Sequence, residues 1–271
     1  MAFLKHWHSI NRRLSDIFTY GIGLGSHPHF LHTNEIYFRE KLRENILRCR
    51  DQFKNESIRV LDIGSGKHTH LESIPDVHGF IVAYGMDISA DELSVNPFIK
   101  HTIIHDVCRT DFASVLREYK GSFHLIMSHN VLEHVRDPQT AHTMILFLLK
   151  PGGIAFHSYP TMWDPLMAAA RLIPGALAEK ILFLIEPFRK ASGKFRTYYR
   201  KNRAFSNSIR TWFESLGFER LEHRDYFGTA YCYSIFPLQW IMDVFYWIVL
   251  KVNIRFFCSH SIVTLRKKST E

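Results

Sequence analysis

The stretch VLDIGSGKH, residues 60–68, decides the fold, because here an apolar run passes directly into a glycine-rich turn. The next apolar run, FIVAYGMD, ends at Asp87, and the one after it, HTIIHD, ends at Asp106. An apolar strand entering a glycine-rich turn, with a carboxylate about 20 residues further on, is typical of nucleoside-binding α/β proteins. We therefore expect parallel strands over these runs, with both carboxylates at one edge of the sheet.

Two further motifs follow in order: FHLIMSHNVLEHV from Phe123 and LKPGG from Leu149. The whole arrangement resembles the class I S-adenosylmethionine (SAM) dependent methyltransferases, of the methyltransferase type 11-like kind, over roughly residues 59–159. The resemblance implies SAM as the cofactor. It also implies an α/β fold with a doubly wound, mostly parallel, Rossmann-like seven-stranded sheet and a helical cap insertion. A dinucleotide oxidoreductase is the main competitor, but it would normally carry a complete G-x-G-x-x-G, and His68 stands where the family usually has a third glycine.

Strand-like runs alternate with helical patterns along the chain, which favours a parallel sheet covered on both faces. The expected strands are residues 57–62, 80–86, 102–105, 123–127, 154–159 and 218–226, with an antiparallel seventh, 261–267, implied by the resemblance. The expected helices are residues 35–50, 71–74, 111–119, 138–149 and 206–216, whereas residues 20–32 should be irregular. We divide the chain into an N-terminal arm and helix (1–52), a SAM-binding core (53–160), a cap (161–204) and a C-terminal part (205–271) with an apolar insertion at 230–255.

The cofactor site is expected at the ends of the first strands. Glycine at 64 and 66 lets the backbone approach a ligand closely, and a carboxylate at 87 can accept both ribose hydroxyls. By resemblance, the residues at 62–66 lie near the methionine part, and the acid at 106 accepts from the adenine amino group. Each feature alone has an ordinary alternative, a glycine turn or an aspartate that caps a turn. The expected cofactor-binding residues are Asp62, Gly64, Ser65, Gly66, Asp87, Ile88, Asp106, Val107, His129 and Asn130.

The segment SHNVLEHV, residues 128–135, carries the expected catalytic group. Asn130, Glu133 and His134 would share one face if this turn were helical. A related Glu-x-x-Glu-His pattern holds a divalent metal in some quinone-pathway and RNA-end methyltransferases, but an asparagine replaces the first acid here, and we expect no metal. A sulfonium methyl donor needs mainly alignment, and an oxygen acceptor benefits from a base poised near neutral pH. We select His134 as this base, ahead of His129 and His157.

Composition limits the setting of this 271-residue chain, which has a formal charge of +8 and four cysteines. The cysteines lie far apart, so neither a disulfide framework nor a zinc site is predicted, and a reducing cytoplasm fits. No signal peptide is recognised at the N-terminus. The basic charge favours anionic partners or simply solvates the surface. An Asn/Asp-Pro-Pro-Tyr segment and a Pro-Cys pair are absent from the sequence, which weighs against two classes of nucleic-acid methylation.

Two segments outside the core should select the acceptor. The segment KFRTYYRKNR, residues 194–203, has five basic residues and could hold a phosphate or carboxylate, or be a solvated loop. Residues 230–250 are almost wholly apolar and near bilayer-spanning length, but Pro237, Gln239 and Asp243 argue against a span. Gln239, Asp243 and Tyr246 would form one narrow polar stripe on a helix that packs on the core or a dimer partner, or lies on a membrane surface.

These features together predict transfer of a methyl group from SAM to an oxygen of a small or lipid-linked acceptor, such as a glycan or isoprenoid. We expect the acceptor to be anionic and the protein to be cytoplasmic. Contact with the inner membrane surface through residues 230–250 is left open, and so is homodimerisation. RNA methylation and a non-catalytic SAM-fold scaffold are the alternatives, although nucleic acid is not the preferred partner.

Overall fold

The computed structural model describes residues 2–54, 56–166, 196–229 and 235–269, together with residues 168, 173 and 232. The chain divides into two compact units, each described by itself below. The sheet unit comprises Glu35–Pro160, Thr197–Arg224 and Ser261–Glu271, and the peripheral unit comprises Met1–Asn34, Thr161–Arg196 and Asp225–His260. Most of the expected cap, residues 161–204, lies outside the described residues, as do parts of the segments at 194–203 and 230–250.

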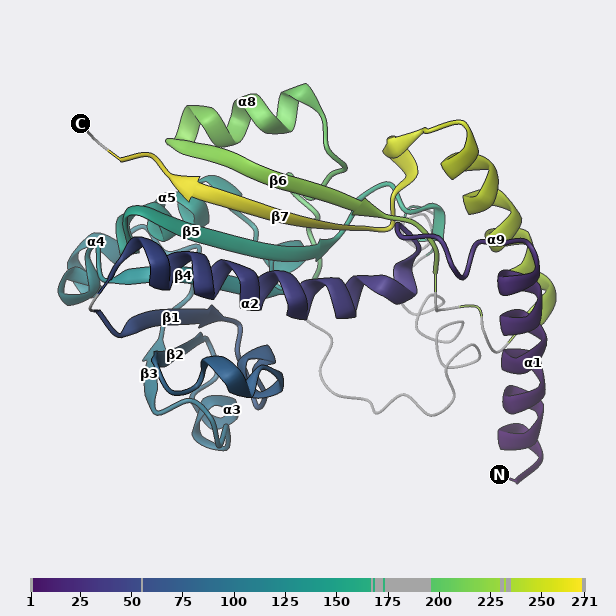
Figure 1. The fold of residues 1–271 in the computed structure, drawn as a ribbon, viewed down its shortest axis with the longest axis horizontal. Coiled ribbons are helices and arrows are strands. Elements are labelled where there is room, and N and C mark those ends of the chain that lie inside the picture. Colours follow the sequence, from purple (N-terminus) through teal and green to yellow (C-terminus); the bar gives the residue numbers. More distant parts are fainter. Residues whose placement is uncertain are drawn as a thin grey trace. The chain divides into compact units, whose positions relative to one another are not determined.

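Seven strands form one sheet in the order β3-β2-β1-β4-β5-β7-β6 (Figure 1). The pairs β1–β2, β1–β4, β2–β3 and β4–β5 are parallel, and the arrow of β7 points opposite to that of β1 in Figure 1. The predicted doubly wound, mostly parallel sheet with an antiparallel seventh strand is therefore confirmed. The strands are β1 (Ile58–Ile63), β2 (Ile81–Asp87), β3 (His101–Ile104), β4 (Phe123–His129), β5 (Leu149–Pro160), β6 (Phe218–Tyr226) and β7 (His260–Lys267).

One strand begins well before its predicted start. We expected a strand over residues 154–159, but β5 already begins at Leu149 and runs through Pro151, Gly152 and Gly153. Phe123 of β4 pairs with Leu149, whereas Leu125 pairs with Ile154, so the register shifts between the two pairs. This irregularity accommodates the proline and glycines inside the strand, because a bulge tolerates residues that cannot complete a regular ladder.

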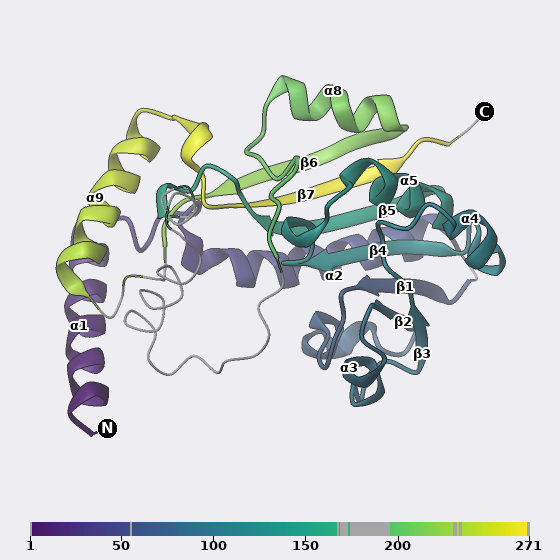
Figure 2. The ribbon, with the colours of Figure 1, turned by 180° about the vertical axis from the view of Figure 1, so that it is seen from behind.

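Helices cover both faces of the sheet. The long helix α2 (Asn34–Gln52) lies on the face shown in Figure 1 and buries Phe38, Leu42, Ile46 and Cys49, four residues at helical spacing. The opposite face, shown in Figure 2, carries α4 (Phe112–Val115), α5 (Pro138–Leu148) and α8 (Asn207–Leu216). A short helix, α3 (Ala90–Ser94), follows β2, and 3-10 turns span His70–Ser73, Pro75–Val77, Arg117–Tyr119 and Leu132–His134.

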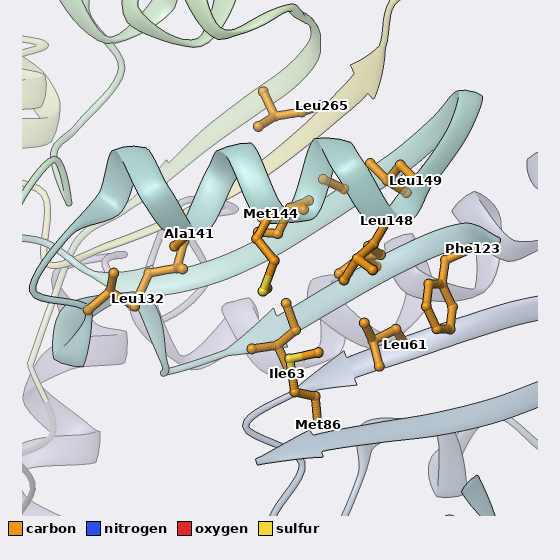
Figure 3. Close-up of a cluster of buried hydrophobic side chains, with 14 of the residues drawn as sticks. Leu61, Ile63, Met86, Phe123, Leu132, Ala141, Met144, Leu148, Leu149 and Leu265 are labelled. Carbon is orange, nitrogen blue, oxygen red and sulfur yellow. The ribbon is translucent and has the colours of Figure 1, made fainter. Parts of the chain in front are cut away.

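The main apolar core fills the space between the strands and α5 and α8. Figure 3 shows its centre, where side chains of α5 meet those of β1, β2 and β4. Helix ends are fixed by the expected local chemistry. The N-cap Ser206 accepts a hydrogen bond from the Ile209 N–H at 3.3 Å, and Gly217 ends α8 with a left-handed φ of 106°.

The peripheral unit contains two helices, α1 (Ala2–Gly21) and α9 (Phe236–Lys251). We did not predict α1, although residues 20–32 beyond it are mostly turns, as expected. The predicted polar stripe on α9 is present and completely buried, because Gln239, Asp243 and Tyr246 are each 0% exposed. Among the helices that the structure describes, none combines the length and apolar character required to cross a membrane.

Candidate active site

The turn after β1 needs glycine for two separate reasons. Gly64 has a φ of +73°, and a Cβ built on it would lie 2.3 Å from a methyl carbon of Val131. Gly66 has a φ of +44°, also in the region that favours glycine. The turn therefore carries no side chain at residues 64 and 66. It lies at the carboxyl edge of the sheet, at the switch point between β1 and β4, where α/β proteins bind ligands.

Asp87 ends β2 with both carboxylate oxygens held by backbone donors. The Gly66 N–H donates to Oδ2 at 3.1 Å, and the Ser89 N–H donates to Oδ1 at 3.0 Å. Each oxygen can accept further hydrogen bonds, because a carboxylate offers about four lone-pair sites. Ile88, expected to pack on adenine, is 57% exposed beside it. This carboxylate is thus fixed in direction and able to receive a diol.

Asp106 lies two residues beyond Ile104, the β3 residue that pairs with Asp87 of β2. Its Oδ1 accepts from the Cys108 N–H at 2.8 Å, as in an ordinary turn cap, and its side chain remains 42% exposed. Val107 is partly buried against the core. The topology therefore brings the acids at 62, 87 and 106 to the carboxyl ends of three neighbouring strands.

The interior of the turn holds an ionisable group and a hydroxyl. Burial, with the nearby Asp87 carboxylate as a smaller cause, raises the pKa of Asp62 to about 7, although a hydrogen bond with Thr69 opposes the shift. The Ser65 hydroxyl is buried and has no hydrogen-bond partner among the described residues. Buried polar groups usually have partners, so this unpaired hydroxyl is an exception inside the turn.

Asn130, Glu133 and His134 would share one face only if the turn after β4 were helical, and it is helical in part only. Asn130 is exposed, with a left-handed φ of 55°, whereas Glu133 is 5% exposed. Only Leu132–His134 is helical, as a single 3-10 turn, so the spacing of a longer α-helix does not apply. Burial raises the pKa of Glu133 to about 8. His134 Nε2 lies 3.8 Å from a carboxylate oxygen of Glu133, and the His134 side chain is 32% exposed.

The other two candidate histidines have different surroundings. His157 is completely buried, its Nδ1 is 2.8 Å from the Ser128 hydroxyl, and burial lowers its pKa well below the ordinary value. It is therefore a neutral core residue. His129 is 15% exposed, and its Nε2 lies 3.1 Å from Glu35 Oε1. Its side chain also contacts His70, with ring centroids 4.3 Å apart.

The basic segment contacts the turn that carries His134. The Tyr198 and Tyr199 N–H groups donate to the Glu133 carbonyl at 2.7 and 3.1 Å, and Arg200 donates to the Arg136 carbonyl at 2.8 Å. The described residues of this segment are therefore packed in part against the site rather than forming only a solvated loop. The sequence suggested its charge but not its position.

His68, which replaces the usual third glycine, points away from the turn, because its side chain is 81% exposed. The sequence did not indicate two residues that lie beside the turn. Asn96, 6% exposed, donates from Nδ2 to the Gly66 carbonyl at 3.0 Å, and Glu92 lies beside Gly66. The sequence also did not indicate Glu35 or His70. No spacing rule joins these residues to the glycine motif, since they come from separate elements.

Comparisons with known proteins identify the family and the fold. The family model for a methyltransferase domain matches residues 33–223. A candidate sarcosine dimethylglycine methyltransferase from Galdieria sulphuraria aligns with a TM-score of 0.51 at 14% identity, over 87% of this chain and 86% of that one. The complex of the Haloferax volcanii Trm112 methyltransferase activator with a candidate methyltransferase aligns with a TM-score of 0.52 at 14% identity, over 86% of this chain and 94% of that one. DszA carbon methyltransferase aligns with a TM-score of 0.51 at 13% identity, over 87% of this chain and 55% of that one.

No curated protein matches the chain by sequence. The family match nevertheless covers most of the chain, and the solved structures share its fold. The chain belongs to the methyltransferase domain family and is a class I SAM-dependent methyltransferase, with SAM as its cofactor. The residues present fit this cofactor, because Gly64 and Gly66 carry no side chain on the turn and the Asp87 carboxylate keeps lone pairs for a polar partner at the expected edge.

Proposed function

We propose that this protein transfers a methyl group from SAM to an oxygen atom of a small or lipid-linked, anionic acceptor such as a glycan or isoprenoid. The observation that carries the proposed donor site is the Asp87 carboxylate, which is tied to the Gly66 N–H and still has lone pairs for two ribose hydroxyls. The acceptor part of the proposal depends on the surroundings of His134 and on the peripheral unit.

Each donor-binding residue has a proposed part. Asp87 accepts from the ribose, Ile88 and Val107 contact the adenine ring, and Asp106 accepts from its amino group. The residues from Asp62 to Gly66 hold the methionine end, and His129 and Asn130 form the floor of the cofactor site. Bound SAM supplies a methyl group already activated on a sulfonium, so the protein's main contribution is alignment.

Replacing Asp87 tests the donor site. Asp87→Ala removes a charged acceptor of about two hydrogen bonds, each worth roughly 1.5–3 kcal/mol, so SAM affinity should fall by at least about tenfold. Calorimetric titration of the folded variant with SAM measures the loss. Asp91→Ala, an exposed acid on α3 of the same segment, is the matched control and should bind normally. Unchanged binding by Asp87→Ala would refute this site, and a wild-type protein without SAM affinity would favour the scaffold alternative.

His134 is the proposed general base. Its partly exposed imidazole lies beside the buried Glu133 and on the turn contacted by the basic segment. His134→Ala should lower kcat by about 10²–10⁴-fold and abolish the acidic limb of its pH profile, while the SAM dissociation constant stays the same. The exposed His101→Ala is a control. If the wild type and His134→Ala had equal turnover at every pH, alignment alone would be sufficient or another group would be the base.

The charge near His134 supports an anionic acceptor. Arg200 and Lys201 come from the segment that contacts the turn after β4, and guanidinium groups bind carboxylates and phosphates with two parallel hydrogen bonds. An RNA acceptor would share this charge preference. Its affinity would fall steeply with salt, whereas a small acceptor would show turnover without RNA.

A lipid-linked acceptor is supported by the reversed polarity of the peripheral unit. Thr19 of α1 donates to Asp243 of α9, and Gln239 donates to the same carboxylate at 2.8 Å. Asn11 and Ser15 lie on the same buried side of α1. The polar side chains therefore face one another inside the unit.

The outer surfaces of the same two helices are apolar. Large exposed side chains include Trp7 and Ile17 on α1, at 55% and 71%, and Trp240 and Ile241 on α9, at 45% and 58%. Exposed Arg12, Arg13 and Lys251 are also present, with the Lys251 ammonium 5.7 Å from the Trp247 ring centroid. Apolar faces bordered by tryptophan and basic residues suit the surface of an anionic membrane. We propose this contact for α1 and α9.

A further inference from the structure

Three side chains with metal-binding atoms meet at the carboxyl edge of the sheet unit. Glu35 lies in the first turn of α2, His70 begins the 3-10 turn after the glycine loop, and His129 ends β4. One carboxylate oxygen and one nitrogen of each imidazole all lie within 4.8 Å of one another. Two imidazoles and a carboxylate are a recurrent donor set for divalent transition metals.

The distances within the cluster are close to those that coordination needs. A tetrahedral ion with bonds of about 2.0–2.2 Å has donor atoms roughly 3.3–3.6 Å apart. His129 Nε2 and Glu35 Oε1 are 3.1 Å apart, and no pair in the cluster is more than 4.8 Å apart. The Glu35 side chain is 47% exposed, so it can adjust its rotamer to an ion without disturbing the core.

The imidazoles of His70 and His129 both pack against the same apolar ring. The Phe38 ring is completely buried, and its centroid lies 5.0 Å from that of His70 and 4.8 Å from that of His129, edge-on in both cases. Phe38 in turn stacks on Phe156 at 4.7 Å. An apolar shell on one side of a metal site limits the access of solvent to it. The exposed carboxylate opposite leaves a side open for further ligands.

We infer that Glu35, His70 and His129 form a binding site for one divalent transition metal ion, of the Zn²⁺ and Co²⁺ type, with at least one open coordination position. This cluster is separate from the Asn130, Glu133 and His134 spacing, and the sequence had led us to expect no metal. Mg²⁺ should bind poorly, because it prefers oxygen donors. If residues from Asp62 to Gly66 hold the methionine end of SAM as proposed, an ion at this edge of the sheet would hold an acceptor oxygen. That role depends on the proposed function, whereas metal binding does not.

Metal titration of the full-length, tag-free protein tests the inference. After chelator treatment, Co²⁺ should bind at one equivalent per chain, with visible absorption of low-symmetry cobalt, and Zn²⁺ should displace it. Glu35→Ala and His70→Ala should each weaken Co²⁺ binding by more than the roughly 10–100-fold cost of losing an outer-shell partner. Glu35→Ala changes an exposed side chain, so it should remain folded, which circular dichroism verifies.

His68→Ala is the matched control, since this exposed histidine is two residues from His70 and should bind Co²⁺ as the wild type does. Absence of Co²⁺ absorption, or equal affinity in Glu35→Ala and His70→Ala, would overturn the site. SAM titration of the same two variants separates the proposals. Retained SAM affinity with lost Co²⁺ binding supports the metal site, and retained Co²⁺ binding excludes it whatever the SAM affinity.

Discussion

Asp62 is the acid whose ionisation is most closely coupled to the proposed donor site. Burial and the neighbouring Asp87 carboxylate place its pKa at about 7, so it is partly protonated at neutral pH in the free protein. A cationic ligand favours the charged carboxylate and lowers its pKa. Donor binding near Asp62 would therefore release a proton below pH 7.

This linkage gives a pH-dependent prediction. SAM affinity should weaken as the pH falls below 7, by up to about tenfold per pH unit, because the proton on Asp62 must leave before the cation binds. Calorimetry in two buffers with different ionisation enthalpies should detect the released proton. Asp62→Asn should bind SAM more weakly but without this pH dependence, and a wild-type affinity that is constant from pH 8 to 6 would contradict the prediction.

At the scale of single residues, the sequence indicated which residues belong to the candidate site better than it indicated the contacts they make. The glycines at 64 and 66 and the acids at 87 and 106 could be found because each follows an apolar run at a fixed spacing. The contact that makes Gly64 necessary could not be found, since Val131 arrives from the turn after another strand. For the same reason Glu35, His70 and His129, far apart along the chain, gave no common signal.

Helix α5 begins at a cap that can be tested at the level of the element. The Asp137 side chain accepts from the Gln139 and Thr140 N–H groups at 3.1 and 3.2 Å. Asp137→Ala should cost about 1 kcal/mol and lower the thermal unfolding midpoint by about 2–4 °C. Scanning calorimetry measures this shift. Gln139→Ala, at an exposed position in the same turn, should change stability by less than about 0.5 kcal/mol. Equal midpoints for the two variants would count against the cap.

The same cap carries a pH signature. Its hydrogen bond with the Thr140 side chain holds the pKa of Asp137 below its usual value. A lowered pKa means that the cap stabilises fully above the ordinary aspartate range and loses this effect as the pH falls through the folded-state pKa. The difference in unfolding free energy between the wild type and Asp137→Ala should therefore become smaller only at acidic pH.

Elements of the core were predictable from the sequence because their apolar residues face inward. Strand β6 matched its predicted range, and α2 and α8 differed only slightly at their ends. Helix α1 was missed for the opposite reason. It buries Asn11, Ser15 and Thr19 and exposes its apolar residues, so the usual rule for an amphipathic helix assigns its faces the wrong way round.

At the scale of the whole molecule, the exposed apolar faces of α1 and α9 predict association with vesicles. The wild-type protein should float with vesicles containing anionic lipid, and less so at high salt, which screens exposed charges. Trp240→Ala combined with Trp247→Ala should reduce flotation by at least about tenfold, since each tryptophan buries a large apolar area. The matched control is Val95→Ala with Val115→Ala, two exposed apolar residues of the sheet unit.

Equal flotation of the wild type and the tryptophan variant would exclude α9 as the attachment. A dimer in solution that the tryptophan variant dissociates, with no flotation of the wild type, would instead assign this face to a second copy of the chain. Light scattering of both proteins separates these results. The fold class could be predicted because strand order follows from the motifs, whereas the packing of residues 2–21 against α9 depends on residues more than 200 positions apart.

The hydrogen bond between the Gly66 amide and Asp87 has one more consequence. If the two halves of the donor bind on either side of this bond, neither half is recognised independently. Binding of the ribose part of SAM at Asp87 would restrain the glycine loop that contacts the methionine part. A nucleoside fragment should therefore raise the affinity of the protein for a methionine fragment. Selectivity for the intact donor would then arise from cooperation between fragments as well as from the sum of their separate contacts.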